Sequence, residues 1–253
     1  MGAAPLWAAG LALAAWWGGT GALMWAVARA DAGGAEARRR LVVLAVPMLA
    51  AGVGAVIVTR GQVGPGPAAA AFLGALAVWA WIELAFLTGV VAGPSRDPGV
   101  PGPGRLRRAW AVVKHHEYAL AFGLGVVAAL HGPGVATWTY AILFAARVSA
   151  KLNLWLGVPR FDPRFLPRAL AHVPSHFGPK RLNRLYPVSV ALLTCGAIAL
   201  GMAAEAGGPR AAGLALLAAL TALAALEHWL MILPVRDDGL WRWATPAPQG
   251  SDE

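Results

Sequence analysis

The chain is built from apolar stretches that are long enough to cross a lipid bilayer as α-helices. Seven can be distinguished, at residues 5–28, 41–59, 68–92, 110–131, 134–151, 187–205 and 211–233. A spanning helix needs about 20 mostly apolar residues. Clusters of proline and glycine separate the stretches, and proline cannot continue the hydrogen bonding of a helix. The sequence therefore predicts an all-α membrane protein, a bundle of about seven transmembrane helices.

The composition excludes several other classes. Apolar residues make up 58% of the chain and charged residues 13%, against roughly 25% charged in a soluble domain. Disorder is excluded for the same reason. The single cysteine, Cys195, rules out a disulfide framework. A net charge of +9 could suggest nucleic-acid binding. In a membrane protein it is better explained by basic loops that meet anionic lipid headgroups, so no nucleic-acid partner is expected.

The distribution of basic residues predicts the orientation. Nineteen of the 21 Lys and Arg residues lie after the first, third, fifth or seventh stretch or at the adjoining helix ends, and only Arg60 and Arg210 lie between the others. Basic residues accumulate on the cytoplasmic side, which places the N-terminus outside and the C-terminus inside. Residues 1–245 are expected to form a single transmembrane domain, and the polar tail 246–253 is expected to be disordered.

Ionisable residues inside the stretches are costly in lipid and mark candidate sites. At 1.5 Å per residue they are expected about 6–14 Å from the cytoplasmic helix ends, within one layer of the bundle. They are Glu83, His115, His116, Glu117, Arg147, Glu227 and His228.

Two interpretations of this layer stay open. In the first it is structural: Arg147 pairs with Glu83, Glu117 or Glu227, and the histidines hydrogen-bond across helices. In the second it is functional, as acid–base groups, as a proton relay, or as a tetrapyrrole site with His115, His116 and His228 as candidate ligands. No metal site is expected, because the spacing of a metal-binding motif is missing from the sequence. His115 and His116 are adjacent and should point about 100° apart on a helix.

Residues 151–186 are predicted to form a long cytoplasmic loop. Basic residues alternate there with aromatic and aliphatic ones, which is typical of short helices lying on a membrane surface. The alternative is a docking platform for a partner, because long loops in compact proteins are often functional. The candidate docking residues are Lys151, Asn153, Arg160, Arg164, Arg168, Arg181 and Asn183. The tripeptides KLN at 151–153 and RLN at 181–183 bracket the loop, and their asparagines are expected to cap or brace short helices.

Three segments resemble a known family. They are KHHEYAL at 114–120, RVSAKLNLWLGVPRFDPRFLP at 147–167 and FGPKRLNRLYPVSV at 177–190. They are similar to the photosynthetic complex assembly protein 2 family, also called PuhE, whose members are polytopic membrane proteins of bacteriochlorophyll-containing bacteria. The resemblance covers about two thirds of the chain and departs from the family at FDPRF, residues 161–165, where this chain is more basic.

The resemblance implies a non-enzymatic assembly factor in the bacterial inner membrane. Its partners would be membrane lipids and subunits of the photosynthetic reaction centre or light-harvesting complex, with bacteriochlorophyll as a candidate ligand and no certain cofactor. Two alternatives remain, a membrane enzyme that uses the intramembrane carboxylates on a pigment or lipid, and a transporter or proton relay.

The charge partition generates a topology prediction. A reporter fused after Glu253 should be active only in the cytoplasm, and a tag placed at Met1 should be accessible from outside. If both ends report from the same side, the number of spans is wrong, and the hairpin expected at Gly132-Pro133 is the first to re-examine.

Overall fold

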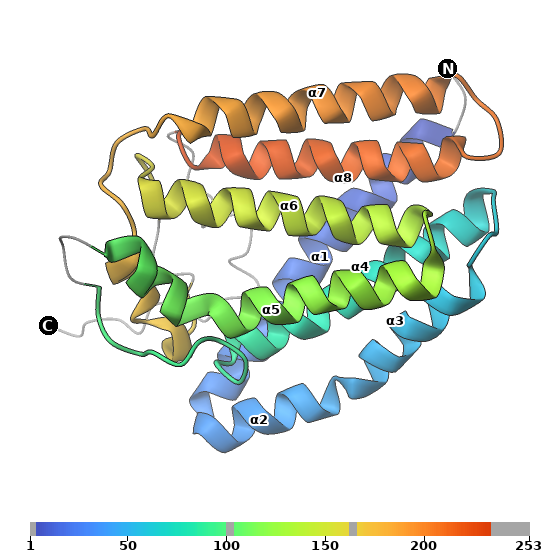
Figure 1. The fold of residues 1–253 in the computed structure, drawn as a ribbon. Coiled ribbons are helices and arrows are strands. Elements are labelled where there is room, and N and C mark those ends of the chain that lie inside the picture. Colours follow the sequence, from blue (N-terminus) through green and yellow to red (C-terminus); the bar gives the residue numbers. More distant parts are fainter. Residues whose placement is uncertain (1–3, 100–103, 162–165, 234–253) are drawn as a thin grey trace, which may run out of the picture.

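A computed structural model describes residues 4–99, 104–161 and 166–233, and the regular structure in these ranges is entirely helical (Figure 1). The α-helices are α1 (Ala4–Ala32), α2 (Gly34–Leu44), α3 (Val46–Val58), α4 (Pro65–Leu87), α5 (Arg105–His131), α6 (Val135–Leu156), α7 (Leu185–Glu205) and α8 (Ala211–Leu230). Two short 3₁₀ turns, η2 (Arg168–Leu170) and η3 (Val173–His176), lie between α6 and α7. The all-α prediction is confirmed, and the predicted tail 246–253 lies outside the described residues.

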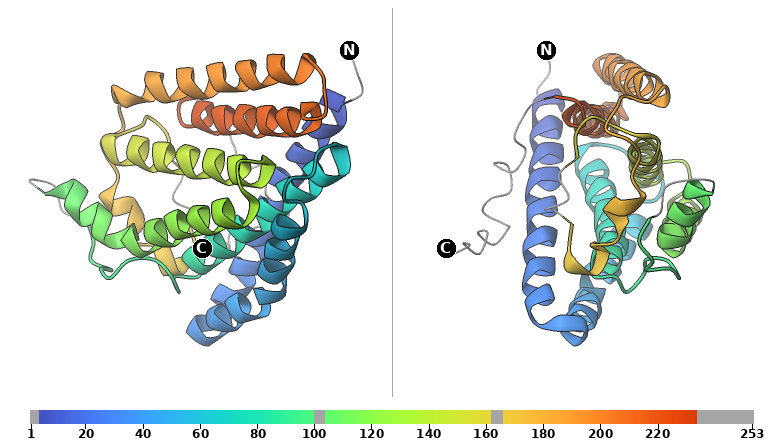
Figure 2. Two further views of the ribbon diagram at one scale, coloured as in Figure 1. Left: turned by 45° about the vertical axis from the view of Figure 1, so that its right-hand side comes forward. Right: turned by 90° about the vertical axis from the view of Figure 1, so that its left-hand side faces the viewer.

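The helices run back and forth between two ends of one bundle (Figure 1). Helices α2 and α3 together make one pass, so the described residues cross the length of the bundle seven times, with the start of α1 and the end of α8 at opposite ends. We call the end with the α3–α4, α5–α6 and α7–α8 connections the turn end, and the other the cap end. Helix α1 crosses α8 and α4 obliquely (Figure 2), and α7 packs mainly on α8.

Among the residues that the structure describes, five segments are long and apolar enough to span a membrane: Leu6–Ala32, Gly34–Val58, Pro65–Leu87, Leu185–Glu205 and Ala211–Leu230. The other two passes, α5 and α6, have 27 and 22 residues, or about 40 and 33 Å at 1.5 Å per residue. They are long enough, but their cap-end turns carry charged residues that lower their mean hydropathy. A membrane bundle is thus supported, while the count of seven spans and the orientation stay predictions.

Four predicted boundaries are wrong by five residues or more, and two of them are the end of α4 at Leu87 instead of residue 92 and the start of α5 at Arg105 instead of residue 110. The second pass begins at Gly34 instead of residue 41, and it is interrupted at Ala45 between α2 and α3. Pro47 lies in the first turn of α3, where its missing N–H needs no partner. Helix α6 continues to Leu156 instead of ending at 151, since the polar groups of its last turns find partners inside the protein.

Glycines bring α3 and α4 into close contact. A Cβ added at Gly52 would lie 2.9 Å from the Gly74 carbonyl oxygen, and one at Gly74 would lie 3.0 Å from the Gly52 oxygen. Small residues at a helix interface allow such backbone approach in membranes. Gly54, two residues further along α3, faces open space.

This geometry predicts that Gly52→Leu destabilises the bundle, because the larger side chain forces α3 away from α4. Overpacking of this kind costs about 1–3 kcal/mol. Gly54→Leu is the matched control, with the same added volume and loss of a helical glycine. The thermal midpoint of the purified protein in detergent should fall for Gly52→Leu alone, and equal midpoints would contradict the close contact.

Candidate functional site: a buried ion cluster

Three helices contribute ionisable side chains to one buried site near the cap end. We call it the ion cluster; its members are Glu83 on α4, His116 and Glu117 on α5, and Arg147 and Lys151 on α6. Arg147 and Lys151 are four residues apart, so they share one face of α6. The sequence predicts that Glu83, Glu117 and Arg147 lie at one depth, and the structure brings them together.

His116 lies at the centre of the ion cluster. Its Nε2 faces Glu83 Oε1 at 3.5 Å and its Nδ1 is 2.9 Å from Lys151 Nζ. Lys151 also donates to Glu117 Oε1, and Arg147 Nη2 donates to Glu83 Oε2 at 2.9 Å. An ammonium can only donate, so Nδ1 of His116 accepts and the imidazole proton is assigned to Nε2, toward Glu83.

The charges of the ion cluster balance. Two carboxylates face one guanidinium and one ammonium, and the imidazole between them is neutral in this assignment. His116 is fully buried, whereas the Arg147 side chain is 35% exposed and that of Lys151 only 10%. The Phe86 ring stacks on the imidazole with centroids 4.1 Å apart. This arrangement satisfies the rule that charge buried in a membrane is paired.

His115, Glu227 and His228 do not join these contacts. His115 is exposed, as the 100° turn from His116 requires. Glu227 Oε1 accepts a hydrogen bond from the Trp16 indole of α1. His228 is buried, with Nδ1 2.9 Å from the Ala224 carbonyl oxygen and Nε2 2.9 Å from Ser149 Oγ. The residues that were predicted to form one layer therefore make separate sets of contacts.

The geometry does not fit a tetrapyrrole bound axially by His116 or His228, because protein groups face both ring nitrogens of each. His115 has an exposed side chain and is the predicted ligand that remains accessible.

Next to the ion cluster, two asparagines join the two ends of the segment between α6 and α7. Asn183 Nδ2 donates to Asn153 Oδ1 at 3.0 Å and to the Gly157 carbonyl oxygen at 2.7 Å. Asn183 Oδ1 accepts from the backbone N–H groups of Leu185 and Tyr186, which caps α7. We call the Asn153–Asn183 contact the asparagine clasp. The asparagines were predicted to cap or brace short helices, whereas Asn183 caps the long helix α7 and Asn153 lies within the long helix α6.

Beyond the clasp, residues 88–99 and the described part of 157–184 form a cap over this end of the bundle. Arg96 joins the two segments by donating to the carbonyl oxygens of Gly89 and Ala169, at 2.9 and 3.2 Å. Burial, and then the nearby Arg96, lowers the pKa of His172. Leu170 and Val173 pack in a buried core with α5. These two residues are buried against protein, so they do not contact a membrane surface as the predicted surface helices would.

The predicted docking residues have different environments. Arg160, Arg168 and Arg181 are exposed on the cap, and Asn183 is half-buried in the clasp. Lys151 and Asn153 are helical and buried, so their assignment to a docking loop is wrong. Arg164 lies outside the described residues.

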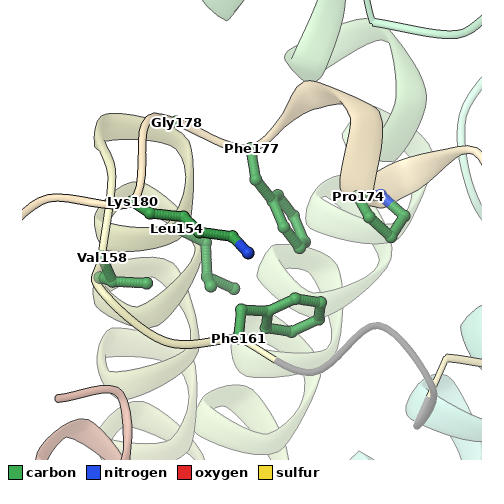
Figure 3. A pocket seen from close by; sticks show the side chains of 7 residues that line it. All are labelled: Leu154, Val158, Phe161, Pro174, Phe177, Gly178 and Lys180. Carbon is green, nitrogen blue, oxygen red and sulfur yellow. The ribbon is translucent and has the colours of Figure 1, made fainter.

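A small apolar pocket of about 180 Å³ opens in the cap (Figure 3). Its walls include Phe161 and Phe177, whose rings meet edge to face at 4.6 Å, and Leu154 of α6. The amine of Lys180 is also part of its lining, so the pocket combines apolar walls with one positive charge.

The sequence analysis does not predict Lys151 as a member of the ion cluster, although its spacing of four residues from Arg147 indicates that both lie on one helix face. It also missed Phe86, which carries no distinguishing signal in an apolar stretch.

Comparison with known proteins gives two matches. The family described as "Protein of unknown function (DUF3623)" matches residues 3–252. A Rhodobacter capsulatus protein described as "Uncharacterized 30.4 kDa protein in puhA 5'region" is 44% identical over 249 residues, which is 94% of this chain and 90% of the relative. No solved structure matches the chain significantly.

The ion cluster predicts a ranking of substitutions. Lys151→Met leaves the Glu117 carboxylate buried without its cation, and breaking a buried pair in this way costs about 3–5 kcal/mol. Arg147→Met should cost less, because water or headgroups reach its guanidinium. Membrane levels and the thermal midpoint in detergent would measure both.

The double variant Lys151→Met with Glu117→Gln is the control, since it removes both charges and should recover much of the lost stability. Wild-type stability of Lys151→Met alone would contradict the assigned pairing.

Proposed function

The chain belongs to the DUF3623 family, and we propose that it is a non-enzymatic membrane assembly factor for the photosynthetic reaction centre–light-harvesting core complex. The observation that carries the proposal is the relative whose description places its gene in the puhA 5' region, which suggests a photosynthesis-related context. Identity of 44% over nearly the whole of both chains makes a shared role reasonable for this protein.

The resemblance to the PuhE family supports the proposal at the residues that organise the structure. KHHEYAL contains His116 and Glu117 of the ion cluster, and RVSAKLN contains Arg147, Lys151 and Asn153. The run FGPKRLNRLYPVSV contains Asn183, the other half of the asparagine clasp. The segments that carry the resemblance thus contain four of the five members of the ion cluster and both asparagines of the clasp.

The cap offers a surface suited to binding another protein. Arg160, Arg168 and Arg181 are exposed on it, and the apolar pocket beside Lys180 could accept a side chain of a partner. Protein interfaces commonly combine an apolar anchor in a pocket with a charged rim. The complementary partner surface would be acidic around an apolar residue, exposed at the cytoplasmic face in the predicted orientation.

The ion cluster favours this role over the enzyme and transporter alternatives. An acid–base group must reach its substrate to act on it, whereas His116 is fully buried and Glu83 and Glu117 are nearly so. A charge-balanced cluster with buried carboxylates instead fixes α4, α5 and α6 at one register beneath the cap.

The docking surface is tested with a triple variant, Arg160→Gln, Arg168→Gln and Arg181→Gln. Each exposed arginine contributes about 1 kcal/mol of attraction to an anionic membrane. Losing three of them should not prevent insertion, because the spanning helices already hold the protein in the bilayer. The variant should therefore insert normally but recover fewer reaction-centre polypeptides on purification. Near-infrared absorbance of the cells should show a lower yield of photosynthetic complex.

A charge-matched control replaces Arg39, Arg60 and Arg210 by Gln. These arginines are also exposed but lie on α2 or at the turn end. Equal absorbance for both triple variants would refute the docking surface. Turnover of a lipid-soluble substrate by the purified protein, or transport driven by a pH gradient, would refute the non-enzymatic role.

A further inference from the structure

A second pocket in the cap, of about 320 Å³, contains charges of both signs. Its lining includes Ser95 and Asp97 from the 88–99 segment, Arg107 and Arg108 from the first turn of α5, and His176 from η3. We call it the charged pocket. Its volume lies in the range of about 300–1,000 Å³ that is usual for small-molecule sites.

Asp97 and Arg107 of this pocket do not form an ion pair with each other. Asp97 accepts a hydrogen bond from Ser95 Oγ at 3.0 Å, and no Lys or Arg of the described residues forms an ion pair with it. Arg107 is exposed and is likewise without a described carboxylate partner. The pocket therefore offers an anionic and a cationic group to one ligand at the same time.

His176 adds a hydrogen-bond acceptor. The side chain is 2% exposed, and its Nε2 lies 3.0 Å from the Asp97 carbonyl oxygen, to which it must donate. Nδ1 of the neutral ring is then an acceptor, and it has no partner among the described residues. Burying a polar atom without a partner is costly, so a ligand that donates a hydrogen bond would be favoured here.

The position of the pocket points to a lipid. Trp110 follows Arg107 by one helical turn and is exposed, with its ring edge to face with Tyr118 at 5.8 Å. Exposed Trp and Tyr side chains gather at the level of lipid headgroups. The charged pocket lies one turn of α5 beyond this aromatic pair, where headgroups are expected.

We propose that the charged pocket binds the headgroup of a phosphatidylethanolamine-type lipid. The phosphate contacts Arg107, and the primary ammonium contacts the Asp97 carboxylate and donates to His176 Nδ1. A phosphatidylglycerol lacks the ammonium, and a phosphatidylcholine has a quaternary nitrogen without N–H groups. Charge and hydrogen bonding together therefore select the primary amine. This proposal is independent of the assembly role.

The test uses the full chain in detergent, titrated with short-chain phosphatidylethanolamine, phosphatidylcholine or phosphatidylglycerol of identical acyl length. Binding is followed by the rise in thermal midpoint, since a ligand that binds only the folded state stabilises it. Apparent affinity for the ethanolamine lipid should exceed that for the choline lipid by about tenfold, the ratio that corresponds to roughly 1.4 kcal/mol. Equal affinities would overturn the proposal.

Two variants separate the contacts. Asp97→Asn should abolish the preference for ethanolamine over glycerol headgroups while the protein remains folded. Arg107→Gln should weaken binding of all three lipids severalfold. Glu205→Gln and Arg39→Gln remove exposed charges of the same sign elsewhere and should change nothing. If either control matches its partner variant, the contacts are not those of the charged pocket.

Soluble phosphoethanolamine distinguishes the source of the headgroup. It should bind at least tenfold more weakly than the lipid, because it gains nothing from the apolar surface around α5. Tighter binding of the soluble compound would overturn the lipid assignment in favour of a free phosphate ester. Discrimination that survives Asp97→Asn would likewise reject the carboxylate–ammonium contact.

Discussion

Charge is buried within a membrane bundle at least cost when it is balanced and hydrogen-bonded, and in the ion cluster each carboxylate accepts a hydrogen bond from a cation. Each of α4, α5 and α6 contributes at least one member, so the register of all three helices is fixed at that depth. A shift of α6 by one residue would turn Arg147 and Lys151 about 100° away from their carboxylates. The cap is built on the ends of these same helices, so its position depends on the contacts made by His116.

Much of this arrangement could be predicted from the sequence. The apolar lengths predict the helices, and the rise per residue predicts that Glu83, Glu117 and Arg147 share a depth. The end of α6 could not be predicted in this way, because hydropathy falls where polar residues begin. Lys151 and Asn153 look like the start of a loop, yet the helix continues because Glu117 and Ser189 provide their partners.

The depth of a residue in the bundle does not determine the direction in which its side chain points. Glu227 and His228 were predicted in the same layer as the ion cluster, but they contact α1 and α6 separately. The face that each presents depends on how α8 is rotated against its neighbours, which one helix in isolation does not reveal. The loop shows a similar ambiguity, since its mixture of aromatic and basic residues is compatible with lipid contact or with the protein packing that Leu170 and Val173 adopt.

The asparagine clasp has a consequence for how this protein can change during evolution. Asn153 and Asn183 join the two ends of the intervening segment directly, and Asn183 also caps α7. The spacing between α6 and α7 is therefore set at the clasp and not by the length of chain beyond it. Lengthening a loop whose ends are already held together costs little, about 0.6 kcal/mol for each doubling. Insertions or deletions between the asparagines could thus alter what the cap recognises while the helices beneath it keep their packing.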